Sequence, residues 1–418
     1  MRKIVLALAS LASLLSVAAA GGATGASGAL DASWGRAGSA GTPLLYGRDL
    51  SLELSGLIRL PNGKVVAEAD WLRDAGNPVR FVARYDANGA PDTRFGHGGV
   101  VRLPAGAGGP LLALRGGLLL AGNVRLRADG AVDRTFRPPS ALLGRARVTD
   151  VVALPDGRLI ETASLNRTRP KGVLFALFRL LPNGRLDTTF GTSRGLTSLA
   201  VGDPRYSLQS PFGITSPRSA IVAPDHSIYV VGEAGATAAS GEFVVIHYSA
   251  EGRPDRSFGK NGVVATRILA GSGASRVVRL RDGRLVVAGY AETGPVDAPG
   301  TTARVALARY RPDGTLDPTF GAGGTLVTSL FTAGIDFPEV ALAAAPAGRL
   351  VVGPHNGYTK VARLLPAGMP DPTFGTGGVI NPKLSWASIV AQPDGKILVG
   401  GISTVHGKLG IVVRRYLH

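Results

Sequence analysis

Seven aspartates are the residues whose type and spacing could do chemistry, because each begins an Asp-x-x-aromatic motif. The aspartates are Asp31, Asp92, Asp133, Asp187, Asp255, Asp317 and Asp371, and the aromatic residues that follow them are Trp34, Phe95, Phe136, Phe190, Phe258, Phe320 and Phe374. Recurring carboxylates suggest calcium, but a calcium loop needs several oxygen ligands from one short segment. Each motif offers a single carboxylate. We therefore predict no metal site, and expect each Asp to cap backbone N–H groups while the aromatic ring packs between repeats.

Other catalytic patterns are missing from the sequence. It has six histidines and no cysteine, and no histidine has a partner at the His-Glu-x-x-His spacing of a zinc site. It contains neither a Gly-x-Ser-x-Gly nucleophile elbow nor a phosphate-binding Gly-x-x-x-x-Gly-Lys loop. We therefore assign no catalytic residue and no cofactor, and the sequence favours a protein that is not an enzyme.

A second set of candidates consists of aromatic and arginine side chains in or beside stretches that break the repeat pattern. Such residues are favoured at binding hot spots, and irregular loops on a rigid scaffold often carry function. The alternative is that they only fill the loops. The candidate ligand-binding residues are Trp71, Arg73, Arg167, Arg169, Tyr206, Tyr290, Phe337, Tyr358 and Trp386.

The elements that must position these residues are short strands. A turn such as Pro155-Asp156-Gly157 or Pro393-Asp394-Gly395 recurs seven times between the aspartate motifs, flanked by runs rich in Val, Ile and Leu that are too short for helices. Each repeat then has four antiparallel strands, the pattern of a propeller blade. We predict an all-β fold, a seven-bladed β-propeller of four-stranded antiparallel blades, with a smaller second blade.

The two ends of the chain complement each other. The last repeat stops at a third strand, 411–416, and the first motif, which begins at Asp31, is the element that should follow such a strand. We therefore expect the strand near 41–46 to join the C-terminal blade and close the ring, which leaves no open sheet edge there.

The residues 308–324 read Ala-Arg-Tyr-x-Pro-Asp-Gly-x-Leu-Asp-x-x-Phe-Gly-x-Gly-Gly. This pattern resembles the delta-60 repeat of bacterial secreted and surface proteins, over about residues 28–418. The resemblance implies a β-propeller and export, and it carries over no catalytic residue. The second repeat departs from the pattern, with Arg137-Pro138-Pro139 after its aromatic residue.

The N-terminus resembles a targeting segment. Arg2 and Lys3 precede an apolar run that ends in Ala18-Ala19-Ala20. We predict a signal peptide at 1–20, cleaved after Ala20, a flexible stretch at 21–27 and one propeller domain at 28–418. No later segment is long and apolar enough to span a membrane, so the expected location is periplasmic or secreted.

Composition leaves three functions open. The leading hypothesis is a monomeric binding or scaffolding module whose irregular loop face takes an extracytoplasmic protein or a polysaccharide. The alternative is a propeller enzyme with a site at the channel mouth: a hydrolase, a lactonase or a quinone-dependent dehydrogenase. A third possibility is adhesion to anionic envelope polymers through arginine, since the formal net charge is +17; nucleic acid is not an expected partner.

Overall fold

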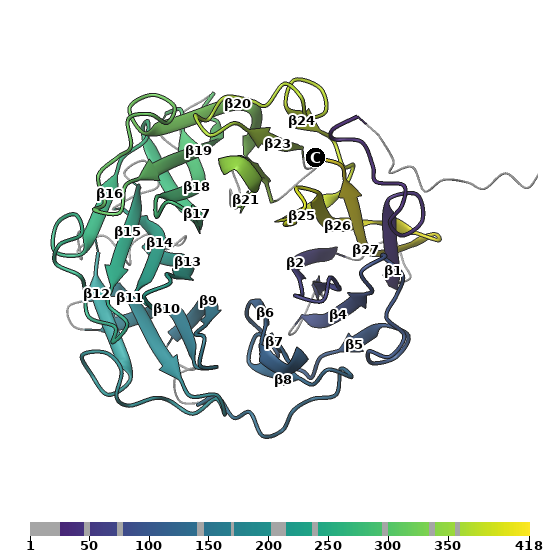
Figure 1. Ribbon diagram of the computed structural model, residues 1–418. Coiled ribbons are helices and arrows are strands. Elements are labelled where there is room, and N and C mark those ends of the chain that lie inside the picture. The colour runs from purple at the N-terminus through teal and green to yellow at the C-terminus, as the bar shows by residue number, and fades with distance from the viewer. Residues whose placement is uncertain are drawn as a thin grey trace, which may run out of the picture.

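Seven antiparallel sheets, the blades, follow one another around a ring (Figure 1). The computed structural model describes residues 26–45, 51–72, 78–139, 146–168, 171–201, 215–235, 241–294, 300–333, 339–355 and 360–418. The predicted signal peptide at 1–20 lies outside this part of the chain. The seven-bladed, all-β fold is confirmed.

The strands of the first four blades follow the chain. Blade 1 holds β2 (Ser51–Arg59), β3 (Val65–Leu72), β4 (Val79–Tyr85) and β5 (Val100–Arg102), and blade 2 holds β6 (Leu111–Ala113), β7 (Leu119–Ala121) and β8 (Val124–Leu126). Blade 3 holds β9 (Ala146–Ala153), β10 (Leu159–Thr168), β11 (Lys171–Leu180) and β12 (Leu196–Ala200). Blade 4 holds β13 (Ser216–Val222), β14 (Ile228–Ala234), β15 (Glu242–Tyr248) and β16 (Val263–Thr266).

The remaining blades complete the ring. Blade 5 holds β17 (Gly271–Arg279), β18 (Leu285–Glu292), β19 (Ala303–Tyr310) and β20 (Thr325–Ala333), and blade 6 holds β21 (Val340–Ala344), β22 (Leu350–Pro354), β23 (Val361–Leu364) and β24 (Val379–Ile380). Blade 7 holds β25 (Ser385–Ala391), β26 (Ile397–Val405), β27 (Lys408–Tyr416) and β1 (Ser39–Leu45). Short 3-10 turns, η1 (Arg115–Gly117) and η3 (Pro346–Gly348), replace two of the Pro-Asp-Gly turns.

Blade 2 is the smaller one, as predicted. Its sheet has three strands among the described residues, whereas each of the other six has four. Pro138 and Pro139 stand where the chain would enter a fourth strand. Proline has no N–H for the ladder, so this sequence disfavours a strand at that position.

The N-terminal strand closes the ring. β1 pairs antiparallel with β27, from Ser39 opposite Arg414 to Leu45 opposite Leu409, and Leu30 bridges to Tyr416. In Figure 1 the purple β1 therefore lies beside the yellow β27. The predicted closure is confirmed, and blade 7 gains its outermost strand from the other end of the sequence.

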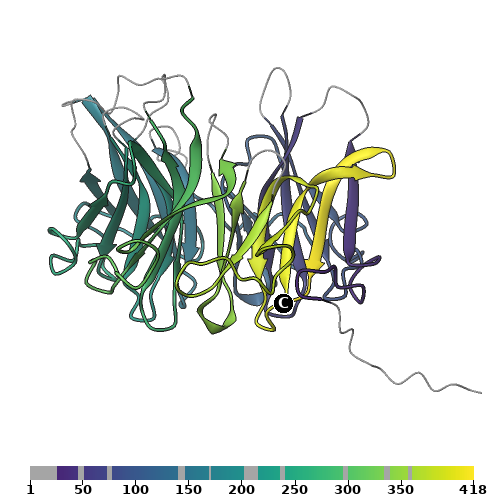
Figure 2. The same ribbon diagram turned by 90° about the horizontal axis from the view of Figure 1, so that it is seen from above.

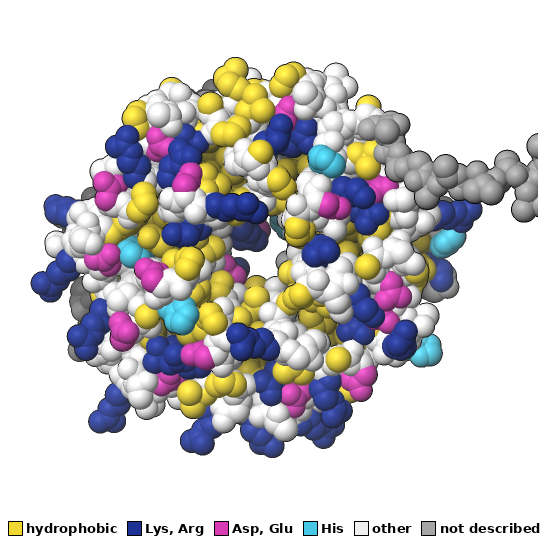
Figure 3. Space-filling model, in the orientation of Figure 1, with side chains coloured by type: hydrophobic (Ala, Val, Ile, Leu, Met, Phe, Trp, Pro, Cys, Tyr) yellow, Lys and Arg dark blue, Asp and Glu magenta, His cyan; other side chains and the backbone are white. Residues whose placement is uncertain are grey.

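The ring has two faces. The turns between first and second strands and the Asp-x-x-aromatic elements lie on one face, which we call the turn face; it is the lower edge in Figure 2 and the face presented in Figure 3. On it, basic and acidic side chains alternate around a central hollow. The opposite loop face carries the connections between second and third strands, such as the β26–β27 hairpin, and the connections between blades.

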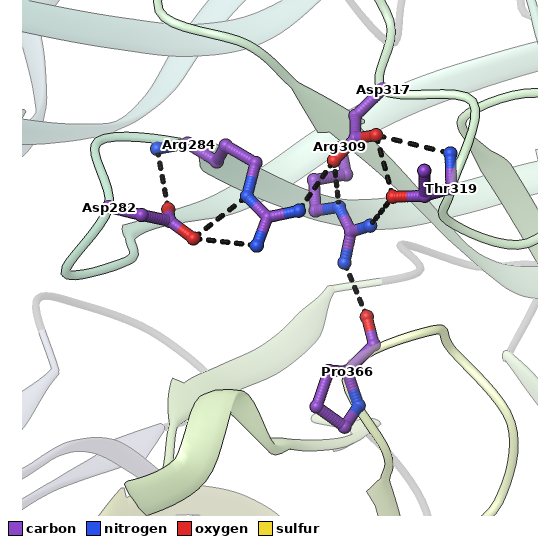
Figure 4. Close-up of polar contacts among 6 residues, drawn as sticks. All are labelled: Asp282, Arg284, Arg309, Asp317, Thr319 and Pro366. Carbon is purple, nitrogen blue, oxygen red and sulfur yellow. Dashed lines mark hydrogen bonds and ion pairs between the residues drawn. The ribbon is translucent and has the colours of Figure 1, made fainter.

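The motif aspartates hold the turn face together. In six motifs the Asp pairs with an arginine of the third strand; for Asp317 the partner is Arg309, 2.8 Å away, and Arg284 of the first hairpin adds a second contact at 2.7 Å (Figure 4). The Asp317 carboxylate also accepts hydrogen bonds from the N–H and hydroxyl of Thr319. The seventh motif, in blade 4, uses His247 instead of arginine, 2.9 Å from Asp255.

The aromatic residues of the motifs are all buried. In six motifs the paired arginine lies over the ring, and in blade 4 the His247 ring meets the Phe258 ring edge-on with centroids 5.4 Å apart. Each ring therefore contacts the side chain that pairs with the aspartate of its own motif. The seven buried residues are Trp34, Phe95, Phe136, Phe190, Phe258, Phe320 and Phe374.

Each motif also joins its blade to the next, as blade 5 shows. The Arg309 guanidinium lies over the Phe320 ring, 4.8 Å from the centroid, and donates to the Pro366 carbonyl of blade 6. A Cβ on Gly368 of blade 6 would lie 3.1 Å from the Phe320 ring, so the two blades touch there. Glycines of the next blade meet the rings of Trp34, Phe95, Phe136, Phe190 and Phe258 in the same way. The rings of these six motifs therefore contact the next blade.

Candidate functional site

The predicted ligand-binding residues separate into three groups. Trp71 and Tyr290 have described side chains, whereas Arg167 in β10 and Trp386 in β25 are described only as backbone. The others lie outside the described residues: Arg73, Arg169, Tyr206, Phe337 and Tyr358. Trp71 packs, partly buried, against the core between blades 7 and 1. Tyr290 lies among charged groups, close to Glu233 and Arg218.

The channel is lined by the innermost strand of each blade: β2, β6, β9, β13, β17, β21 and β25 (Figure 1). On or beside these strands, five blades carry ionisable side chains that interact electrostatically with one another. We call them the mouth cluster: Glu53 of β2, Arg147 and Asp150 of β9, Arg218 of β13, Arg276 of β17, Glu339 directly before β21 and His355 directly after β22.

Bulges in the inner strands orient this cluster. In four of them the ladder to the second strand skips one residue, always six positions before the first residue of the hairpin turn. The skipped residues are Ser55, Thr149, Arg218 and Ser275. A β-bulge bends the strand and re-aims the neighbouring side chains, and bulges recur next to active sites. The shared position of these bulges gives the inner strands a common bend beside the mouth cluster.

A hydrogen-bonded triad joins blades 4 and 5 at the edge of the mouth cluster. Arg218 contacts the Glu233 carboxylate at 2.6 Å, and the Tyr290 hydroxyl donates to the other oxygen of Glu233 at 3.0 Å. Glu233 is buried, so both contacts act where water competes little. The triad fixes Arg218 at the channel wall.

Gly273 leaves the room that this triad needs. A Cβ there would overlap the Glu233 carboxylate and lie 2.5 Å from Tyr290 Cε1. We expect Gly273→Ala to lower the free energy of unfolding by about 1–3 kcal/mol through overpacking. Denaturant unfolding of Gly273→Ala, Tyr290→Ala and the double variant measures this loss of stability. The loss caused by Gly273→Ala should be smaller when Tyr290 is already replaced by alanine. Equal costs in both backgrounds would contradict this account.

The mouth cluster keeps Glu339 ionised. Burial alone would raise the pKa of Glu339, but the positive charges of Arg276, His355 and Arg218, with Arg147 across the channel, outweigh it and lower that pKa. The Glu339 carbonyl also accepts the N–H of His355 at 2.8 Å. Burial lowers the pKa of His355 itself, and the negative charge of Glu339 opposes this effect.

Glu53 lies in the opposite kind of surroundings. Burial raises its pKa, and the negative charges of Asp70 and Glu339 raise it further. Asp70 belongs to an acidic group between blades 1 and 2, where Arg80 contacts Asp70 at 3.0 Å and the fully buried Glu68 at 3.6 Å. Burial raises the pKa of Glu68 to about 8. The charge nearest to Glu53 within blade 1 is therefore the negative charge of Asp70.

The sequence predictions did not include the mouth cluster, because much of the inner strands reads as apolar. The runs 151–154 and 340–345 are apolar, but Asp150 and Glu339 directly precede them. The sequence nevertheless contains a signal for it. Glu53 and Arg147 each stand eight residues before the first residue of the hairpin turn in their own blade. Asp150 and Arg276 each stand five residues before that turn in their own blade. Equal positions in equivalent strands place side chains at the same height in the channel.

Two kinds of feature are absent from the part of the chain that the structure describes. Among the residues with described positions, no three His, Asp or Glu side chains are arranged to hold a metal ion. The same residues include no helix long and apolar enough to cross a membrane.

Comparison with known proteins adds the repeat family. Residues 60–95, 280–320 and 392–417 match the model described as a domain of unknown function (DUF5122) beta-propeller. The matched segments are similar to the repeats of this β-propeller model. The matched segments each contain a hairpin turn or an Asp-x-x-aromatic motif, so family model and structure agree on the repeating unit. No curated protein matches the chain in sequence.

Two solved structures are similar to the chain at low sequence identity. The α-L-arabinofuranosidase of glycoside hydrolase family 93 from Fusarium graminearum is 11% identical over 90% of this chain and 97% of its own, with a TM-score of 0.47. A protein of unknown function from Dyadobacter fermentans gives 11% over 90% and 99%, with a TM-score of 0.43. Similarity at this level concerns the fold alone.

Proposed function

We propose that this protein is an exported binding module that holds a polysaccharide at the loop-face mouth of its channel. The observation that carries the proposal is the mouth cluster, in which blades 1, 3, 4, 5 and 6 contribute side chains to one place. A sugar hydroxyl both donates and accepts hydrogen bonds. Guanidinium groups that only donate, beside carboxylates that only accept, therefore complement a polyhydroxylated ligand.

The arrangement also supports tight positioning. Arg218 is held by Glu233, which is in turn held by Tyr290. Side chains fixed before binding lose little conformational entropy when a ligand arrives. Export is part of the proposal and rests on the N-terminal pattern at 1–20.

Replacing Arg276 tests the proposal. Affinity electrophoresis through gels containing xylan, pectin, alginate or dextran would show retardation of the wild-type protein by at least one polymer. We expect Arg276→Ala to weaken that binding at least tenfold, which corresponds to about 1.4 kcal/mol. Arg279→Ala is the matched control: it removes the same side chain from the turn-face end of β17 and should bind as the wild type does. Binding that survives Arg276→Ala unchanged, or no retardation by any polymer, would refute the proposal.

A further inference from the structure

Blade 4 differs from the other six blades in the partner of its motif aspartate. The Asp255 carboxylate lies 2.9 Å from Nδ1 of His247. Because a carboxylate only accepts hydrogen bonds, Nδ1 carries the proton of the neutral imidazole and Nε2 carries none. Nε2 is buried and has no hydrogen-bond partner among the described residues. The neutral ring therefore satisfies Asp255 and leaves only an acceptor atom without a partner.

The histidine makes fewer contacts than the arginines that stand in its place elsewhere. In blades 2, 3 and 5 the guanidinium also donates to a backbone carbonyl of the next blade, that of Pro182, Ala250 or Pro366. The Asp255 side chain is 32% exposed, whereas those of the other six motif aspartates are at most 13% exposed. Water therefore screens the charge of Asp255 more than the charges of the other six.

His247 supports the apolar contact between blades 4 and 5. Its ring stacks on Tyr229 of β14, with centroids 4.0 Å apart and planes 7° apart, and meets the Phe258 ring edge-on. Tyr229 and Phe258 belong to a buried cluster that continues into blade 5 with Val277 and Leu285. A shift of the imidazole would therefore disturb the packing between the two blades.

The groups around His247 favour its neutral form on balance. Burial lowers the pKa of His247 and outweighs the negative charges of Asp255 and of Asp225, in the β13–β14 turn, which raise it. From blade 5, the positive charge of Arg279 in β17 acts on Tyr229, the stacking partner. Protonation would place a charge and a new N–H donor at the buried Nε2, where no acceptor lies among the described residues.

We propose that His247 is a pH-sensitive switch of the contact between blades 4 and 5. The neutral imidazole holds the two blades together through its stack with Tyr229 and Phe258, and protonation loosens them. When the contact is open, His247 binds a proton below about pH 6.5. The closed contact resists that proton, so its stability is full above about pH 6.5 and declines as the pH falls further.

The switch would reach the loop face as well. The triad of Arg218, Glu233 and Tyr290 joins the same two blades. Loosening of their contact would therefore release the side chain that the triad fixes at the channel wall. The switch itself does not depend on which ligand the mouth takes.

Hydrogen exchange followed by mass spectrometry at pH 7 and pH 5, corrected for the intrinsic exchange rate at each pH, tests this inference. Amide protection in β15 and β17 should fall between these pH values by roughly five- to thirtyfold more than protection in β10 and β11 of blade 3. His247→Arg restores the guanidinium of the other six motifs and should abolish this difference. His247→Gln cannot be protonated, and it should abolish the difference even if an arginine does not fit in blade 4.

His97→Gln is the matched control, because it makes the same replacement at an exposed histidine of blade 1. This variant should exchange as the wild type does at both pH values. Wild-type protein in which β15 and β17 lose no more protection than β10 and β11 would overturn the inference. A loss of protection that persists in His247→Gln would overturn it as well, since another group would then be responsible.

Discussion

Asp317→Ala is expected to lower the free energy of unfolding by about 3–5 kcal/mol, because it removes the partner of a buried arginine. The Arg309 side chain is 3% exposed and that of Asp317 is 5% exposed. Without the carboxylate, Arg309 keeps its contacts to Thr319 and to the Pro366 carbonyl but loses its counter-charge. Because Arg309 connects blade 5 to blade 6, the loss should weaken the whole ring.

Denaturant unfolding at several pH values measures this effect. Contacts to Arg284 and Thr319 outweigh burial and hold the pKa of Asp317 well below its usual range. The pKa of this carboxyl group is lower in the folded state than in the unfolded state, where it is about 3.9. The group therefore stabilises the fold at pH values above about 3.9, and this contribution fades as the pH falls further. The difference between wild type and Asp317→Ala should therefore be full at pH 7 and shrink below about pH 4.

Asp313→Ala is the matched control. Asp313 lies four residues earlier, on the exposed Pro-Asp-Gly turn, and its side chain accepts hydrogen bonds from the N–H and the hydroxyl of Thr315 in the same turn. Its replacement should leave the unfolding midpoint close to that of the wild type. A cost for Asp317→Ala no larger than that for Asp313→Ala, or one independent of pH, would show that the motif aspartates do not join the blades.

Deleting residues 1–45 is expected to have the second large effect, because β1 closes the ring. The deletion exposes the edge of β27 along its ladder with Ser39–Leu45. It also removes Asp31, which contacts Arg415 at 2.9 Å and Lys396 at 3.0 Å, and the buried Trp34. Loss of one large buried aromatic residue alone costs about 3–5 kcal/mol.

Thermal unfolding followed by circular dichroism should show the midpoint of the shortened protein lowered by roughly 10 °C or more. Size-exclusion chromatography should show association through the open edge of β27. Deletion of residues 1–25 is the control and should leave the midpoint unchanged. Adding a peptide of residues 26–45 should raise the midpoint of the shortened protein. A shortened protein that stays monomeric with the wild-type midpoint would exclude this role for β1.

The fold could be predicted because its determinants are local and repeated. Pro-Asp-Gly turns fix hairpins, and the Asp-x-x-aromatic element fixes the entry to the outer strand, so seven copies of each define seven blades. Closure could also be predicted, since the first motif and the last strand are each incomplete alone. The reduced second blade followed from Pro138 and Pro139 for the same local reason.

The partners of the motif aspartates were less predictable. Local capping by Asp could be expected from the residue two positions later, such as Thr319. The arginine eight positions earlier, such as Arg309, was not recognised as the main partner, although Ala-Arg-Tyr recurs in the repeat. The aspartate and this arginine meet across a hairpin. The sequence pattern shows that they are eight positions apart, but not that their side chains form an ion pair.

The mouth cluster was decided by the tertiary structure. Sequence alone determined that each repeat would become a blade, because turn chemistry acts between residues close in the chain. Which side chains meet in the channel depends on ring closure and on bulges such as that at Arg218, which change where the neighbouring residues point. Glu53 and Glu339 are 286 positions apart in the numbering and share one channel only because seven blades close into a ring.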